Sequence, residues 1–159
     1  MLTVIRRRIV EPVLSLLAQG LAPRELALCM ALGAGIGLFP VLGVSTPALT
    51  VLALWLRLNL PAIQLISYLM SPLQLVLIIP FVRLGETIVG AEPQPLTIEA
   101  GLELIANGVL EAIITLWDAI LHAAIGWVLI GPVFIYVIYR LLIPVLERAL
   151  ARLKSIEPS

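Results

Sequence analysis

The chain is 159 residues long, a length typical of a single domain. Hydrophobic residues make up 61% of it and charged residues 13%, whereas soluble domains contain about 45–50% and about 25%. A soluble domain of this size cannot hide so much apolar surface, so the composition excludes an ordinary water-soluble protein and predicts one membrane domain over residues 1–159. The net charge is zero, which excludes a global attraction to nucleic acid.

Residues 1–20 are predicted to form an amphipathic helix that lies in the membrane interface. The apolar residues that recur at helical spacing on one face are Leu2, Ile5, Ile9, Val13 and Leu16. The neighbouring run Arg6 to Arg8 suits anionic headgroups. Because Glu11 and Pro12 interrupt the apolar run and no small-residue cleavage site follows, we expect a retained helix and not a signal peptide.

Residues 23–57 are predicted to form a hairpin of two short helices. Residues 26–56 carry no charge, and this run is too long for one straight crossing, which takes about 20 residues. Within it, "GAGIGLFPVLGVSTP" (33–47) holds four glycines and two prolines. These glycines and prolines divide the uncharged run into two pieces, each too short to span the membrane comfortably. The hairpin is therefore either re-entrant or tightly transmembrane, with Pro40 to Gly43 near its tip.

The glycines and prolines of this hairpin suit two roles. Small residues at G-x-x-x-G spacing, such as Gly33 and Gly37, let helices approach closely in lipid. A broken backbone at membrane depth must be buried in protein or line a wet cavity. A packing notch in an oligomer and a transport pathway both meet that condition. The residues expected to break or pack the helices are Gly33, Gly35, Gly37, Pro40, Gly43, Pro47 and Pro72.

Residues 60–83 are predicted to form a membrane helix that Pro72 kinks. Residues 60–82 carry no charge and are long enough to cross once. A second re-entrant hairpin, folded at Ser71-Pro72, is the alternative. The polar residues that share one face are Gln64, Ser67, Ser71 and Gln74. This face is expected to look inward, either to form hydrogen bonds between helices or to line a polar pathway.

The remaining residues divide into three predicted segments. Residues 84–118 contain six of the ten acidic residues and are predicted to form an acidic loop followed by an interfacial helix. Residues 119–139 read as a transmembrane helix. It is expected to continue into a basic amphipathic helix in the tail, residues 140–159. The predicted fold class is therefore an all-α integral membrane protein.

Few residues suggest chemistry. Glu111, Asp118 and His122 lie on one helical face, where Asp118 and His122 could relay protons or bind a metal. A solvated polar stripe explains the same spacing, and one helix alone does not make a metal site. Cys29, the single cysteine, is expected to be a packing residue. Without a hydrolase motif, the sequence does not indicate an enzyme, and no catalytic residue, metal or cofactor is expected.

The positive charges predict the topology. If residues 26–56 enter and return while residues 60–82 and 119–139 each cross once, nine of the ten cationic residues share one side and Arg83 lies opposite. By the positive-inside rule, both termini are then cytoplasmic. Two crossings by residues 26–56 would sort the charges in the same way.

Three stretches resemble a known family. They are "GAGIGLFPVLGVSTP", "LRLNLP" (56–61) and "SPLQLVLIIPFVRLG" (71–85), and they are similar to the bacterial membrane family called domain of unknown function 2062. The positions that fit are Gly33, Gly37, Pro40, Gly43, Arg57, Asn59, Pro61, Pro72 and Gly85. Ser71 replaces the asparagine usual in the family. The resemblance covers about residues 22–86 and implies a bacterial inner-membrane protein without an established activity.

These observations predict transport or handling of a lipid or lipid-linked anionic substrate in the cell envelope. The candidate substrate- or lipid-binding residues are Arg57, Asn59, Ser71, Gln74 and Arg83. The alternative is a non-catalytic accessory or assembly subunit of a larger membrane complex. The expected partners are membrane lipids and either further copies of the chain or a larger membrane assembly, because a chain of this size scarcely encloses a pathway alone.

Overall fold

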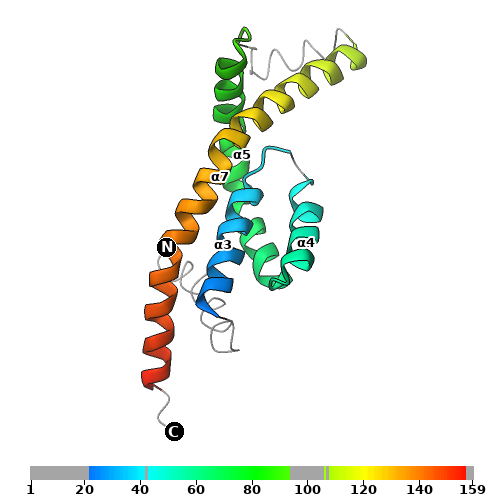
Figure 1. Ribbon diagram of the computed structural model, residues 1–159. Coiled ribbons are helices and arrows are strands. Elements are labelled where there is room, and N and C mark those ends of the chain that lie inside the picture. The colour runs from blue at the N-terminus through cyan, green and yellow to red at the C-terminus, as the bar shows by residue number, and fades with distance from the viewer. Residues whose placement is uncertain (1–21, 42, 94–105, 107, 157–159) are drawn as a thin grey trace.

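The structure, a computed structural model, describes residues 22–41, 43–93, 106 and 108–156, and every regular element in these ranges is an α-helix (Figure 1). In chain order they are α3 (Pro23–Gly37), α4 (Ser45–Leu56), α5 (Leu60–Val89) and α7 (Val109–Ile156). The predicted amphipathic helix over residues 1–20 lies outside the described residues, as does most of the acidic loop, residues 94–105.

Helices α3 and α4 are the two short helices expected on either side of the glycine–proline segment. Pro23 stands in the first turn of α3, where its missing N–H costs no hydrogen bond. Between α3 and α4, the described residues 38–41, 43 and 44 are not helical, and Gly43 has φ +85°, which suits glycine. This segment is called the break. Helix α4 ends at Arg57, which has left-handed backbone angles (φ 55°, ψ 39°).

The contacts fix the directions of the helices. Along α3, Gly33 lies against Ile63 of α5 and Gly37 against Ser67, so the two helices run the same way. Helix α7 runs in the opposite direction to α5, because Gly126 lies against Phe81 whereas His122 lies against Gly85. Phe39, just past α3, contacts Gln74, about 21 Å along α5 from Leu60. The hairpin therefore reaches only about halfway along α5, and α5 and α7 continue beyond it (Figure 1).

Glycines allow these helices to cross closely. A Cβ built on Gly85 of α5 would lie 1.8 Å from the His122 carbonyl oxygen of α7, and one on Gly126 would lie 2.5 Å from the Phe81 carbonyl oxygen. A Cβ on Gly33 would lie 2.6 Å from the Ile63 carbonyl oxygen. Each obstacle is backbone that cannot rotate away, so glycine is required at these three crossings.

Two apolar clusters hold the helices together. The larger joins α3, α4 and the start of α5 to the end of α7, and its large buried side chains include Leu26, Leu49 and Ile63, with Leu146 from α7. The smaller joins α5 and α7 beyond the hairpin through Phe81, Val82 and Ala123. Cys29 is fully buried in the larger cluster.

Helix α7 is one continuous helix of 48 residues. It includes residues 119–139 and the basic segment after them, which were expected to be continuous. It also includes the end of residues 84–118, which were expected to form a separate interfacial helix. The helix continues through the Gly131-Pro132 pair and through Pro144. Figure 1 shows that the yellow part of α7 leans away from its orange part. Because a proline removes one backbone hydrogen bond, we attribute this change of direction to Pro132.

Two of the described helices are long and apolar enough to cross a membrane: α5, and α7 over residues Ile114–Arg152. Helix α5 is likewise continuous through Ser71 and Pro72, so it does not fold back there. Large apolar side chains point outward from both helices, for example Val76 and Val128. A bilayer core is about 30 Å thick and takes about 20 residues, so each helix exceeds that thickness.

Candidate functional site

The tip of the hairpin is fastened to both long helices by side-chain hydrogen bonds. The Trp127 Nε1 of α7 donates to the Gly35 carbonyl oxygen at 3.0 Å. The Gln74 Nε2 of α5 donates to the Phe39 carbonyl oxygen. Both acceptors belong to the last turn of α3 or to the break that follows it, where the regular helical hydrogen bonds end. The Gly35 carbonyl oxygen also accepts a longer hydrogen bond from the Leu38 N–H, at 3.3 Å. Protein groups thus satisfy backbone that lipid could not.

Prolines at the tip differ in their surroundings. Pro40 is buried, whereas Pro47 at the start of α4 and Pro72 within α5 are exposed. Gly43 is also exposed, and nothing lies within 4 Å of a Cβ built on it. The beginning of the break is therefore covered by protein, and its end is not.

The polar face of α5 is turned toward the hairpin. The Gln64 Nε2 donates to the Thr46 carbonyl oxygen and to the Thr50 Oγ1, both at 3.0 Å. Ser67 is buried against Gly37, and Ser71 is half-buried. Gln64 thus joins α5 to α4 within one chain, and Ser67 packs against α3.

Two buried polar atoms near this face have no hydrogen-bond partner among the residues that the structure describes. They are the Oγ of Ser45, in the first turn of α4, and the Oε1 of Gln64. Buried polar atoms in proteins are nearly always paired. The α4–α5 interface therefore retains unused hydrogen-bonding capacity.

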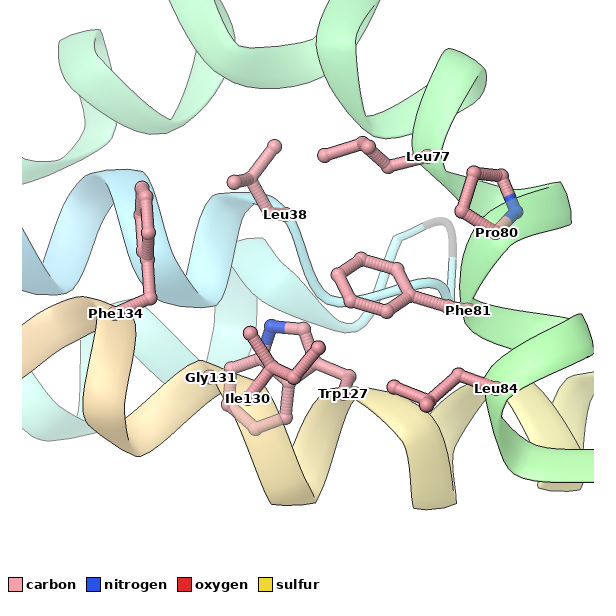
Figure 2. Close-up of a pocket in the computed structure, with 9 residues that line it drawn as sticks. All are labelled: Leu38, Leu77, Pro80, Phe81, Leu84, Trp127, Ile130, Gly131 and Phe134. Atoms are coloured by element: carbon pink, nitrogen blue, oxygen red, sulfur yellow. The ribbon is translucent and has the colours of Figure 1, made fainter. Parts of the chain in front are cut away.

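An apolar pocket of about 250 Å³ lies at the hairpin tip. Its lining comes from three elements (Figure 2): Leu38, Leu77, Pro80, Phe81, Leu84, Trp127, Ile130, Gly131 and Phe134. The Trp127 ring meets Phe39 edge-on with ring centroids 5.0 Å apart. The sequence analysis did not single out this pocket, because it combines residues that are far apart in the sequence.

Arg57 and Asn59 lie at the other end of the hairpin, where α4 ends and α5 begins. Arg57 is exposed. The Asn59 Oδ1 accepts a hydrogen bond from the Ala62 N–H at 2.9 Å, so this side chain caps α5. The structure thus gives Asn59 a local role and separates both residues from the pocket.

Replacement of the cap tests that role. We expect Asn59→Ala to destabilise the protein by about 1 kcal/mol, because the Ala62 N–H loses its acceptor. Asn59→Asp restores an acceptor at the same position and is expected to retain wild-type stability. Unfolding in mixed detergent micelles, followed by circular dichroism, measures the difference. Equal stability of the alanine and aspartate variants would contradict the capping role.

Arg83 lies near the far end of α5, and its Nη1 donates to the Glu86 Oε2 at 2.9 Å. The Glu86 side chain is 3% exposed and that of Arg83 is 41% exposed. The sequence analysis placed Arg83 among the binding residues but did not anticipate a buried carboxylate. The sequence feature that could have indicated this ion pair is the spacing of three residues between the two charges on one helix.

Asp118 and His122 are brought together on α7. The His122 Nδ1 donates to the Asp118 carbonyl oxygen at 2.8 Å and lies 3.4 Å from the Asp118 Oδ2. The imidazole is buried at the close crossing with Gly85. Glu111 belongs to the first turn of the same helix. Across the described part of the chain, no three metal-ligating residues gather into a group.

Comparison with known proteins identifies a family. No curated protein and no solved structure matches the chain. A family model described as an uncharacterized protein conserved in bacteria matches residues 6–154. The match extends in both directions beyond the residues 22–86 that carry the resemblance in the sequence. The chain therefore belongs to the bacterial family called domain of unknown function 2062.

Proposed function

We propose that the protein resides in the bacterial inner membrane, with both termini cytoplasmic, and transports or handles a lipid or lipid-linked anionic substrate. The observation that carries this proposal is the half-length hairpin, whose tip is fastened to Gln74 about 21 Å along α5 from Leu60. With Leu60 at the edge of a core about 30 Å thick, the break lies deep in the bilayer. Broken helices at such depth are typical of transporter binding sites.

The charges at the open end of the hairpin support an anionic substrate. The exposed arginines at this end are Arg24, Arg57, Arg148 and Arg152. Leu26 of α3 packs with Leu146 of α7, which brings the start of the hairpin close to the end of α7. Guanidinium groups bind phosphate oxygens by paired hydrogen bonds. In this proposal the arginines meet the headgroup, and Arg83 serves the opposite surface.

The backbone of Arg57 adds support. Left-handed angles cost a residue with a side chain about 1–2 kcal/mol relative to glycine, yet this position carries arginine. Local strain of this kind is concentrated at functional sites. We interpret the strain as the cost of placing a cationic side chain at the end of α4.

Two substitutions separate stability from function. We expect Arg57→Gly to raise the unfolding free energy by about 1 kcal/mol, because glycine relieves the left-handed strain. It should also weaken association with phosphatidylglycerol. Loss of one positive charge near the membrane surface costs about 1 kcal/mol, which corresponds to an affinity about fivefold lower. Arg57→Lys keeps the charge but not the paired hydrogen bonds, so we expect it to lose less association than Arg57→Gly and to gain no stability. Detergent unfolding and lipid-binding titrations measure both effects, and unchanged association of Arg57→Gly would contradict the proposed headgroup contact.

A reconstitution experiment tests the activity. Vesicles that contain fluorescent phosphatidylglycerol, with and without the protein, are exposed to dithionite, which bleaches only the outer leaflet. We expect the protein to accelerate loss of the protected inner pool. Rates equal to those of protein-free vesicles, across phosphatidylglycerol, cardiolipin and phosphatidic acid, would overturn the proposal.

The alternative, an accessory or assembly subunit, is favoured by a different observation. Gln64 and Gln74 both bond within the chain, and the glycine rows pack its own helices. By contrast, two buried polar atoms that lack a partner among the described residues favour transport. They are the Ser45 Oγ and the Gln64 Oε1, and a polar substrate or water would satisfy them. Stoichiometric co-purification with another membrane protein, together with inactivity in vesicles, would support the accessory role.

A further inference from the structure

We propose that the apolar pocket at the hairpin tip holds one acyl chain of a membrane phospholipid. This inference rests on the proposed function and names the part of the lipid that this site receives. The pocket lies beyond the end of α3, between α5 and α7, and is lined by side chains from all three elements (Figure 2).

The side chains that line the pocket favour a hydrocarbon ligand. The only polar side-chain atom among the nine lining residues is the Trp127 Nε1, and it already donates to the Gly35 carbonyl oxygen at 3.0 Å. A headgroup, a sugar or water entering the pocket would lose hydrogen bonds without replacement. An apolar chain loses none.

The volume suits part of an apolar chain. The cavity of about 250 Å³ exceeds the about 150 Å³ of an apolar cavity that binds benzene. It therefore has room for part of an extended hydrocarbon chain.

The surroundings determine the source of that chain. The pocket lies between the two helices that are apolar enough to cross a membrane. Exposed apolar residues adjoin the lining on both, including Val76 and Ile79 on α5 and Leu129 on α7. A chain therefore reaches the pocket from lipid and not from water. Since the bilayer interior already consists of acyl chains, contact with the pocket walls and not the hydrophobic effect retains this one.

Trp127 connects the occupant to the hairpin. The same indole lines the pocket, meets the Phe39 ring edge-on and holds the Gly35 carbonyl oxygen. A chain in the pocket packs directly against the side chain that fastens the tip. Trp127 is therefore the natural reporter of occupancy.

The test uses the full chain with Trp55→Phe and Trp117→Phe, which leaves Trp127 as the only tryptophan. The protein is reconstituted into vesicles of phosphatidylglycerol with dibrominated acyl chains, because bromine quenches indole fluorescence on contact. We expect strong quenching. Leu84→Phe, which fills the pocket, should lower quenching at least twofold, and Leu75→Phe, an exposed position on the same helix, should leave it unchanged.

Leu77→Phe also fills the pocket, from another turn of α5, and is expected to behave like Leu84→Phe. It provides an independent test if Leu84→Phe does not fold. Equal quenching in the filled and control variants would overturn the proposal, since it would mean that only surrounding lipid reaches Trp127. Loss of quenching on addition of a few mole per cent of unbrominated polyprenyl phosphate would also overturn it, in favour of an isoprenoid chain.

The dithionite assay on the same vesicles separates this inference from the proposed function. Accelerated lipid redistribution with equal quenching in all variants would overturn the acyl-chain site alone. Pocket-dependent quenching without redistribution would overturn the transport activity and leave the acyl-chain site standing.

Discussion

Gly85→Ala is expected to cause the largest loss of stability of any single substitution at the helix crossings. The new Cβ would lie 1.8 Å from the His122 carbonyl oxygen and 2.4 Å from its carbonyl carbon. Backbone atoms in the middle of α7 cannot rotate away, so α5 and α7 must separate along their contact. We expect a loss of about 3 kcal/mol or more, at the upper end of the range for overpacking.

Unfolding in mixed micelles, followed by circular dichroism, measures this loss. The control is Val128→Leu, which adds one carbon to an outward-facing side chain of α7 and is expected to change stability by less than about 0.5 kcal/mol. Wild-type stability of Gly85→Ala would show that the two helices do not cross at this glycine.

Gln74→Leu is expected to release the hairpin tip. It removes the donor to the Phe39 carbonyl oxygen and leaves that oxygen unpaired in apolar surroundings. An unsatisfied buried acceptor costs about 1–3 kcal/mol. The loss falls on the tip, because the larger apolar cluster holds the opposite end of the hairpin through residues such as Leu26 and Leu49.

Hydrogen exchange of the backbone amides at Leu38 and Phe39 provides the measurement, and we expect it to accelerate at least tenfold. Ser71→Ala is the matched control. It changes a half-buried polar residue one turn away that forms no side-chain hydrogen bond with the described residues. Equal exchange in the two variants would mean that Gln74 does not hold the tip.

The short helices of the hairpin could be predicted from the sequence because the signal was local. Thirty-one uncharged residues, too many for one crossing, contain a dense group of glycines and prolines, and breakers of this kind act on the backbone around them. Several positions of the family resemblance now have physical reasons. Asn59 caps α5, Pro61 stands in its first turn, and Gly33 and Gly85 allow close crossings.

The pocket and the ion pair could not be predicted, because they depend on contacts between distant residues. Trp127 and Gly35 are 92 positions apart, and no local pattern indicates their hydrogen bond. The start of α7 was missed for another reason. Residues 119–139 were expected to continue into the basic segment, as they do, but a separate interfacial helix was expected before them because the composition changes there from acidic to apolar. Composition alone does not end a helix, and α7 is continuous from Val109 onward.

With the protein in a bilayer as proposed, the short reach of the hairpin gives its described part unequal widths in the two leaflets. In the proposed orientation, four of the described helices displace lipid in the cytoplasmic leaflet, whereas only α5 and α7 do so beyond the tip (Figure 1). A body of this kind is a wedge. It fits best where the cytoplasmic leaflet is the expanded one, so its distribution between tubes and flat sheets of membrane should depend on the sign of their curvature.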